Sequence, residues 1–228
     1  MKLSNKLLIG FFGGAMIYML MAFAEVRLRG DDRRLTGNNA KVESVPLANV
    51  RFINLNDLGK RINIESSYNP RIEMRSKDGD VLSGLKYELN GDTLTLTQLE
   101  VGEDVRISLT IYVPDNGSIG LSSNNARVYM SKLDVSAIAI MQTGGRIVFE
   151  DDVRLQRLML QVGEDARFDL YSGEIDSVTL NMNNSSATIR SRIGLLDGFM
   201  ANDSDLMIGS ISEITFKKDN SSSIRLFD

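Results

Sequence analysis

Short runs of alternating apolar and polar residues follow one another from Val50 to the C-terminus. This two-residue period is that of a β-strand, whose successive side chains point to opposite faces of a sheet. Turn-forming residues separate the runs, as at Asn90-Gly91 and at Pro114–Gly117. No window longer than about a dozen residues in this region keeps the 3.6-residue period of a helix. The body of the protein is therefore predicted to be all-β.

The second half of the chain repeats a unit made of a strand, a turn of small residues and a second strand. The leading apolar residues of the second strands are separated by 19, 21, 21, 17 and 18 residues; they are Val128, Ile147, Phe168, Ile189, Leu206 and Ile224. In addition, Val101–Arg106 recurs as Val162–Arg167, an offset that we interpret as three coils. A period near twenty is typical of a solenoid, in which each coil buries its inward side chains against its neighbours.

We therefore predict a right-handed parallel β-helix of about 20-residue coils. A β-sandwich is the alternative, because it also contains many short strands joined by turns. A sandwich would not keep a fixed register between turn and strand over six units.

One long apolar segment precedes this pattern. Leu7–Ala24 is uncharged, and as a helix it would be about 27 Å long, close to the thickness of a bilayer core. Lys2 and Lys6 stand before it, so it is predicted to be a transmembrane signal anchor or a signal peptide cleaved near Ala24. Either outcome exports the body, because the short amino tail cannot hold a domain.

Four parts are expected: a cytoplasmic tail at 1–6, the N-terminal hydrophobic helix at 7–24, a polar linker at 25–48 and the β-helical domain at 49–228. The linker is polar and aperiodic, which favours a solvated spacer over a segment that binds lipid headgroups. The body is expected in the periplasm, tethered to the inner membrane by one span, or released after cleavage.

Composition narrows the chemistry. The formal net charge is −4 with 25% charged residues, so the protein has no general electrostatic attraction to nucleic acid. The sequence contains no cysteine and no histidine, which removes disulfides, thiolate nucleophiles and the usual general base near neutral pH. We expect a non-catalytic protein with no metal site and no cofactor.

The repeat also aligns four basic residues, which are Arg106, Arg127, Arg146 and Arg167. Each stands one residue before an apolar position, so each is predicted to point outward, about 4.8 Å from its neighbour along the stack. Such a column could bind an acidic glycan, a phosphate or a lipid headgroup. The alternative is a charge ladder neutralised by the nearby turn residues Glu103, Asp104, Glu164 and Asp165.

Other polar clusters are interpreted as turns. Glu150–Asp152, Asp203 and Asp205 carry carboxylates that suit Ca²⁺, but their spacing matches no known Ca²⁺ loop. Asparagines recur at the corners, where stacked amides are favoured over a sugar site; they are Asn124, Asn125, Asn181, Asn183, Asn184 and Asn202.

The pattern resembles the auto-transporter adhesin-head (GIN-type) family, short-coil β-helix envelope proteins of Bacteroidetes type. The resemblance runs from about Val50 to the C-terminus and rests on the strand Val105–Val113 followed by Pro114, and on the small-residue turns before paired apolar positions. The leading MKLSNKLLIG is similar to the start of anchored members. The family implies a β-helix at the cell envelope, with no shared binding residue to carry over. The cysteine of lipidated members and a translocator barrel are missing here.

These observations together favour a membrane-anchored envelope protein whose β-helix is a structural or interaction module with an envelope protein or glycan partner. Self-association is also expected, because Ser223–Asp228 ends in strand pattern and leaves an open edge. One alternative is a secreted or periplasmic β-helix that binds or acts on acidic polysaccharide. The other is a β-sandwich that carries a lipid or small ligand.

Overall fold

The computed structural model describes residues 19, 40–77, 79–102 and 105–227. The chain divides into two units, Met1–Ala40 and Lys41–Asp228. The expected helix at 7–24 lies outside the described residues, apart from residue 19. Among the residues that are described, no helix is long and apolar enough to cross a membrane.

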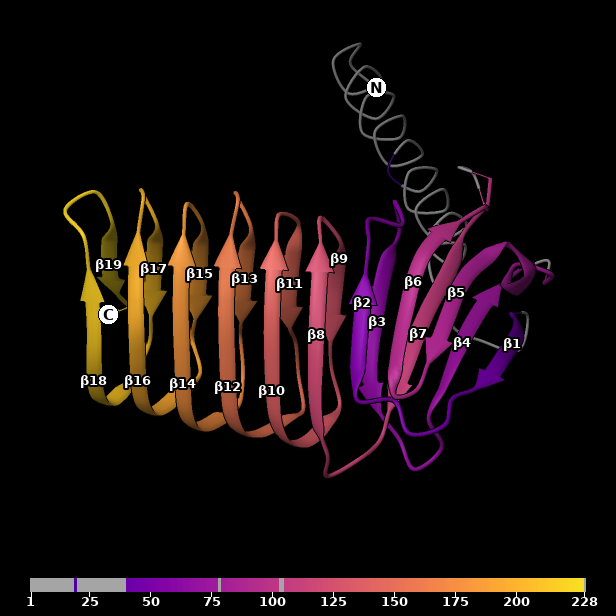
Figure 1. Cartoon of the computed structure of the whole chain (residues 1–228), viewed down its shortest axis with the longest axis horizontal. Coiled ribbons are helices and arrows are strands. Elements are labelled where there is room, and N and C mark those ends of the chain that lie inside the picture. Colours follow the sequence, from indigo (N-terminus) through magenta and orange to yellow (C-terminus); the bar gives the residue numbers. More distant parts are fainter. Residues whose placement is uncertain (1–18, 20–39, 78, 103–104, 228) are drawn as a thin grey trace, which may run out of the picture. The chain divides into compact units, whose positions relative to one another are not determined.

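From Ser118 onward the second unit is a right-handed parallel β-solenoid (Figure 1). Each coil places one long strand in a nine-stranded sheet, sheet B, and one short strand in a ten-stranded sheet, sheet A. Equivalent strands of successive coils pair in parallel. The sheet B strands are β8 (Ser118–Asn124), β10 (Leu133–Thr143), β12 (Val153–Gly163), β14 (Glu174–Asn183), β16 (Arg192–Ala201) and β18 (Ile211–Lys218). Those in sheet A are β9 (Arg127–Met130), β11 (Arg146–Phe149), β13 (Arg167–Leu170), β15 (Ser186–Ile189), β17 (Asp205–Ile208) and β19 (Ser223–Leu226). The predicted parallel β-helix is confirmed.

Apolar side chains at equal positions of successive coils stack into columns that fill the space between the sheets. One column of sheet A consists of Val128, Ile147, Phe168, Ala187, Leu206 and Ile224, separated by 19, 21, 19, 19 and 18 residues. Ile189 was wrongly predicted in this column and lies one inward position further on, beside Leu170 and Ile208. The spacing of large apolar residues favoured Ile189, but the small Ala187 fills the place next to the bulky ring of Phe168.

The corners between the sheets depend on residues that accept a left-handed backbone. Asn125 has a φ of 53° and Asn184 a φ of 47°; in the coil that follows Asn125, Gly144 takes its place with a φ of 64°, and the next residue, Gly145, has a φ of 65°. A Cβ on Gly145 would lie 2.4 Å from the carbonyl oxygen of Ala126, so only glycine fits there. Corner side chains also bond between coils, as where Asn184 Nδ2 donates to Asp165 Oδ1 at 3.1 Å. An amide–amide contact between coils is present at the next corner, where Asn202 Nδ2 donates to Asn183 Oδ1 at 2.6 Å.

The first part of the unit is not a plain continuation of the coils. It contains β1 (Lys41–Pro46), β2 (Phe52–Leu55), β3 (Arg61–Ser66), β4 (Arg71–Ser76), the 3₁₀ turn η1 (Leu82–Gly84), β5 (Leu85–Asn90), β6 (Thr93–Leu99) and β7 (Ile107–Val113). The coil β2–β3 lies beside β8–β9, and the coil β6–β7 lies on its other side. The chain therefore passes the β2–β3 coil on its way from β7 to β8. Antiparallel β4, β5 and β1 cover the outer end as a cap (Figure 1).

Two expectations about this region are wrong. The linker was expected to reach residue 48, but Lys41–Pro46 forms β1 and pairs with β4. Glu43 fastens this strand, since its carboxylate accepts hydrogen bonds from the backbone N–H groups of Leu82 at 2.8 Å and Val81 at 3.1 Å, and also from that of Asp80. The polar sequence of β1 hid it, because an edge strand buries few side chains.

The offset between Val101–Arg106 and Val162–Arg167 is also not three coils. Val162 lies in β12, in register with Leu96 of β6 through the intervening strands, whereas Val101 follows β6 in the connection to β7. The longer β6–β7 connection breaks the repeat at this point.

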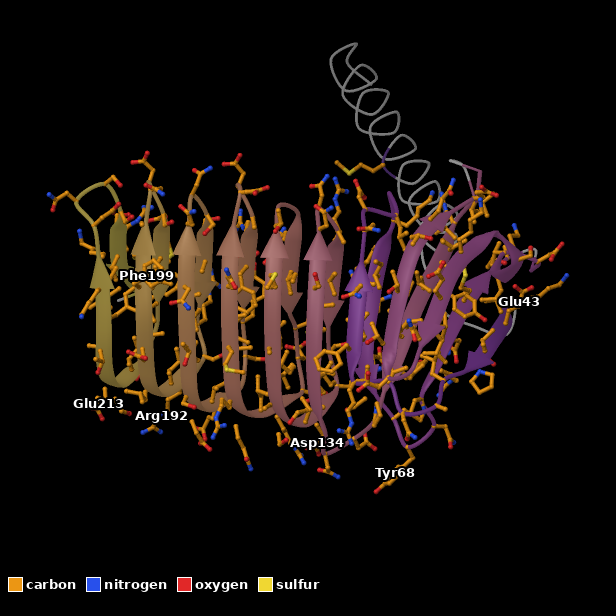
Figure 2. The ribbon with its side chains drawn as sticks, viewed as in Figure 1. Glu43, Tyr68, Asp134, Arg192, Phe199 and Glu213 are labelled. Atoms are coloured by element: carbon orange, nitrogen blue, oxygen red, sulfur yellow. The ribbon has the colours of Figure 1, made fainter. Side chains whose placement is uncertain are left out.

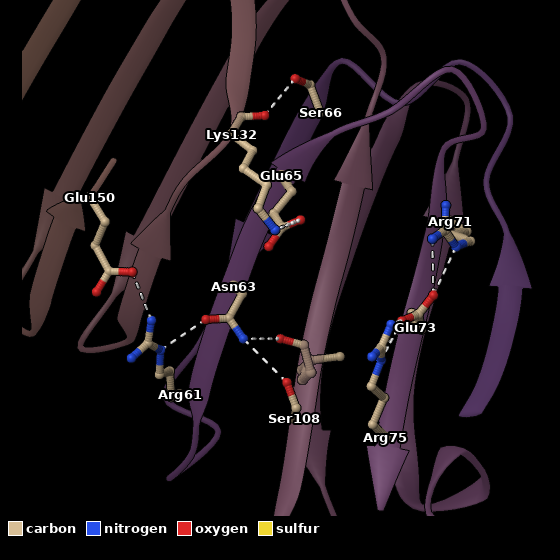
Figure 3. Close-up of polar contacts among 11 residues, drawn as sticks. Arg61, Asn63, Glu65, Ser66, Arg71, Glu73, Arg75, Ser108, Lys132 and Glu150 are labelled. Carbon is tan, nitrogen blue, oxygen red and sulfur yellow. Dashed lines mark hydrogen bonds and ion pairs between the residues drawn. The ribbon is translucent and has the colours of Figure 1, made fainter. Parts of the chain in front are cut away.

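A buried carboxylate on the cap strand β4 is paired with two arginines of the same strand. Glu73 is 5% exposed and lies between Arg71, whose Nη2 is 3.0 Å from Oε2, and Arg75, whose Nη2 is 2.8 Å from Oε1 (Figure 3). Burial raises the pKa of Glu73, but the hydrogen bonds from Arg75 and Arg71 outweigh it and leave the pKa below its ordinary value. The guanidinium of Arg71 also stacks on the ring of Tyr112 at 3.7 Å.

A solenoid held only by neighbouring coils should tolerate the removal of one whole coil. Arg167 pairs with Ser186, so deleting residues 167–185 joins Ala166 to Ser186 with the register kept. We expect this variant to retain its β-sheet circular dichroism and cooperative thermal unfolding. The control deletion of 167–175 removes nine residues, an odd number, so Ser177 takes the inward place of Phe168 and Val178 the outward place of Asp169. This variant should fail to fold. Equal loss of structure in both variants would contradict the coil-by-coil architecture.

Candidate functional site

Two surfaces of the solenoid are candidate sites: the arginine column on sheet A and the outer face of sheet B. The register aligns Arg61, Arg127, Arg146 and Arg167 on neighbouring strands. We call these four residues the arginine ladder. Arg106 is not among them, because it precedes β7. The residue of β7 that is level with Arg61 is Ser108. Arg61 therefore takes the place that was predicted for Arg106.

A buried carboxylate neutralises one end of the ladder. Asp169 is fully buried, and its Oδ2 lies 2.6 Å from Arg146 Nη2 and 3.1 Å from Arg167 Nε. Arg146 Nη2 also donates to the hydroxyl of Tyr171 at 3.2 Å. Burial lowers the pKa of Arg146, but the hydrogen bond and charge of Asp169 outweigh it and raise the pKa above its ordinary value. Both guanidinium groups are therefore committed to an internal partner.

The other end of the ladder is paired as well. Arg61 Nη2 lies 3.1 Å from Glu150 Oε2, and Arg61 Nε donates to Asn63 Oδ1 at 2.8 Å (Figure 3). Its guanidinium stacks on the ring of Tyr129 at 3.6 Å. Three of the four arginines thus have carboxylate partners within the part of the chain that the structure describes.

The neutralising acids differ from those that the sequence suggested. Glu103 and Asp104 lie outside the described residues, and Asp165 accepts a hydrogen bond from Asn184 at its corner. The partners are instead Asp169, two residues after Arg167 on the same strand face, and Glu150, which follows β11 two coils from Arg61. Binding of an anion by the arginine ladder stays a prediction. The ladder has little uncompensated positive charge, because three of its arginines are paired with carboxylates.

The outer face of sheet B carries a shallow trough of about 490 Å³. Two columns of outward side chains form its floor and walls. The first column is Phe52, Gly120, Ala139, Met159 and Thr179, and the second is Asn54, Ser122, Met141, Gln161 and Asn181. We call these ten residues the outer trough. They come from β2, β8, β10, β12 and β14, so the trough runs along the solenoid axis.

The first column of the outer trough is largely apolar and the second carries the amides, and none of the ten residues is charged. Met141 is 55% exposed and Met159 is 45% exposed, because both point outward from the sheet. The amide groups of Asn54, Gln161 and Asn181 all belong to the second column. A quarter of the chain is charged, so ten adjoining outward positions without charge form an unusual surface.

Gly120 shapes one end of the outer trough. A Cβ at this position would lie 2.4 Å from Cδ1 of Phe52, because the phenyl ring lies directly over the glycine. The missing side chain therefore lets Phe52 lie against the sheet and hollows the surface beside it. A second hollow of about 400 Å³ adjoins the trough and extends to Phe199 on β16. Phe199 is labelled in Figure 2.

The acidic run Glu150–Asp152 does not form a metal cage in the structure. Glu150 pairs with Arg61, and Asp152 has a φ of 58° at a corner. Asp205 is bound by Arg225 and Ser223 of the last coil. Among the described residues no group of three or more acidic side chains converges as a metal site would require.

Comparison with solved structures finds the same fold in bacterial proteins. A "putative adhesin" of Bacteroides fragilis is similar with a TM-score of 0.55 and 12% identity, covering 84% of this chain and 98% of that one. A "putative adhesin" of Parabacteroides distasonis is similar with a TM-score of 0.53 and 9% identity, covering 82% of this chain and 93% of that one. No protein-family model and no curated protein matches the sequence. The likeness shows that the chain shares the β-solenoid fold of these proteins.

The sequence could have revealed the partner of Arg167 but not the outer trough. Arg167 and Asp169 are two residues apart on a strand, which places both side chains on one face. Met141 and Met159 lie in separate repeats, and only the stacking register shows that they meet on one outer surface.

Removal of the Asp169 carboxylate tests the state of the ladder. In Asp169→Asn, Arg146 and Arg167 lose their shared partner, so we expect the free energy of unfolding to fall by about 2 kcal/mol. We also expect retention on a heparin column to increase, because two cations are released. Asp165→Asn is the control, since it makes the same charge change at an exposed corner. If both variants are retained equally, Asp169 does not mask the ladder.

Proposed function

We propose that the protein is a non-catalytic interaction module of the cell envelope, tethered to the membrane by residues 7–24, which binds a neutral glycan chain along the outer trough. The apolar length and the lysines of the N-terminal segment support the tether. The uncharged surface of the trough supports the choice of ligand. The shared fold is the basis for adding that the module belongs with the GIN-type adhesin heads.

The single observation that carries the binding proposal is the largely apolar column that lies beside a column of amide-bearing side chains over five adjoining strands. A sugar ring has an apolar face and a hydroxyl-bearing edge, so it matches such a lining. Met141, Met159 and Phe52 would contact ring faces, while Gln161, Asn54 and neighbouring amides would bond hydroxyl groups. A long trough on a rigid solenoid can contact several units of one chain.

Acidic polysaccharide is the second ligand to consider, and the arrangement of charge disfavours it. The outer trough contains no cation, and three cations of the arginine ladder are paired with Asp169 or Glu150. Polyanion binding depends on uncompensated basic side chains, which neither surface offers in quantity.

Binding is tested with Met159→Glu, which places a charge in the middle of the outer trough. We expect retardation by neutral polysaccharides in affinity electrophoresis, with affinity reduced about tenfold or more in the variant. Met207→Glu is the matched control, because Met207 lies on β17 of sheet A and outside the trough. It should bind like the unchanged protein.

A screen of neutral and acidic polysaccharides decides between the two ligand classes. Binding to acidic chains only, with Met159→Glu unaffected, would overturn the neutral-glycan proposal. Loss of binding in both Met159→Glu and Met207→Glu would show that the trough is not the site.

The tether has its own test, which is alkaline-carbonate fractionation of cells that express a C-terminally tagged copy. We expect the protein in the membrane pellet, with an intact mass that still includes residues 1–24. A soluble product that begins at Glu25 would show cleavage instead. The body would then be a released protein.

A further inference from the structure

The two ends of the solenoid differ in how they are finished. At the first end, β4 and β1 extend sheet A and β5 extends sheet B, all in antiparallel pairing, and together they form the cap. At the last end, β18 is the outermost strand of sheet B and β19 is the outermost strand of sheet A. Within residues 105–227 no element covers the outer side of this coil. Its backbone edge and its inward side chains are therefore open to a partner.

The open coil exposes residues that belong to the core columns. Ile214 follows Leu196 in its column and is 52% exposed, whereas Leu196 is fully buried. Leu226 follows Ile208 in sheet A and is 70% exposed, whereas Ile208 is fully buried. Another layer of strands would bury these side chains as each earlier coil is buried by the next.

The terminal coil is nevertheless firmly built. Asp219 accepts hydrogen bonds from the backbone N–H groups of Asn202 and Ser222, both at 2.9 Å, and this fixes the turn between β18 and β19. Lys218 Nζ donates to the carbonyl oxygen of Ser222 at 3.0 Å in the same turn. Arg225 and Asp205 join β19 to β17. The edge that β18 presents is thus an ordered strand.

We propose that a second copy of this chain covers the open end, with the two β18 strands paired antiparallel about a two-fold axis beside Thr215. In a symmetric antiparallel pair one residue must face its own copy, and the residues on either side of it face each other in reverse order. The sequence of β18 can therefore be tested against each choice of central residue.

Only Thr215 as the centre matches both faces of the strand. On the inner face, Ile214 then opposes the partner's Phe216, which is apolar against apolar. On the outer face, Glu213 opposes the partner's Lys217, which is acid against base. Side chains directly opposed in antiparallel strands lie about 5 Å apart, within reach of an ion pair.

The neighbouring registers fail. With Phe216 as the centre, Ile214 would oppose the partner's Lys218 and Glu213 would oppose the partner's Asp219. With Ile214 as the centre, Ser212 would oppose the partner's Phe216. Glu213 and Lys217 are both exposed and appear in no ion pair of the described part of the chain (Glu213 is labelled in Figure 2). Their free charges thus suit a symmetric partner.

This pairing would continue sheet B from one copy into the next. Because the two-fold axis is perpendicular to the sheet, the outer faces of both copies point to the same side. Two outer troughs would then lie on one surface, which would raise the avidity for a long repeating ligand. The dimer itself does not depend on the proposed glycan binding.

The dimer is tested in the full chain by cysteine crosslinking, which has no background because the sequence contains no cysteine. Thr215 faces its own copy at the axis, at a separation that a disulfide can bridge. We expect T215C to form a disulfide-linked dimer on non-reducing gels after mild oxidation. T179C is the matched control, since Thr179 lies in the same outward column two coils back. It should crosslink about tenfold less.

Charge reversal tests the register independently. In the T215C background, E213K places a lysine opposite the partner's Lys217. K217E places a glutamate opposite the partner's Glu213. Each should reduce crosslinking about tenfold, and the double change E213K/K217E should restore it. E174K is the control, because Glu174 is exposed on β14 away from the end.

Equal crosslinking of T215C and T179C would overturn the dimer. Undiminished crosslinking in both single charge variants would overturn the Thr215-centred register. A crosslink from T215C to a different protein would show that the end belongs to another partner. Failure of glycan binding with an intact crosslink would contradict only the proposed function.

Discussion

The structure depends on one constraint: each coil must lie on its neighbour in parallel, in register, with its apolar side chains stacked inward. Parallel pairing repeats the same positions every 18 to 21 residues in the column from Val128 to Ile224. The core is therefore a set of columns, and each coil is stable only because another covers it. Corners follow from the same constraint, since Asn125, Gly145 and Asn184 take the left-handed backbone that reverses the chain without breaking the stack.

Because the core is built of layers, its two ends determine how the protein can associate. The first end is covered by β1, β4 and β5, and the buried carboxylate of Glu73 lies between Arg71 and Arg75 in this cap. The last end presents β18 and β19 with core positions exposed. Edge strands are usually protected by charge, and on β18 the charges of Glu213 and Lys217 are also arranged to complement a symmetric copy.

Stacking also explains why the outer faces differ from each other. On sheet A the repeat aligns arginines, and a ladder of like charges needs compensation; Asp169 is fully buried between Arg146 and Arg167, and Glu150 pairs with Arg61. On sheet B the same register brings methionines and amides of separate coils together, and Gly120 makes room for the ring of Phe52. One surface is thus occupied by its own ion pairs, and the other is left open for a ligand.

The sequence by itself determined the strand period, the coil length and the corners, because these depend on residues close together in the chain. It also gave three of the four ladder positions, Arg127, Arg146 and Arg167. Tertiary structure decided the rest. Ala187 replaced Ile189 in its column because packing beside Phe168 selects size, and Arg61 replaced Arg106 because the chain crosses the β2–β3 coil. Strand β1, the outer trough and the Arg146–Asp169 and Arg61–Glu150 pairs arise from contacts between distant segments, which local periodicity does not encode.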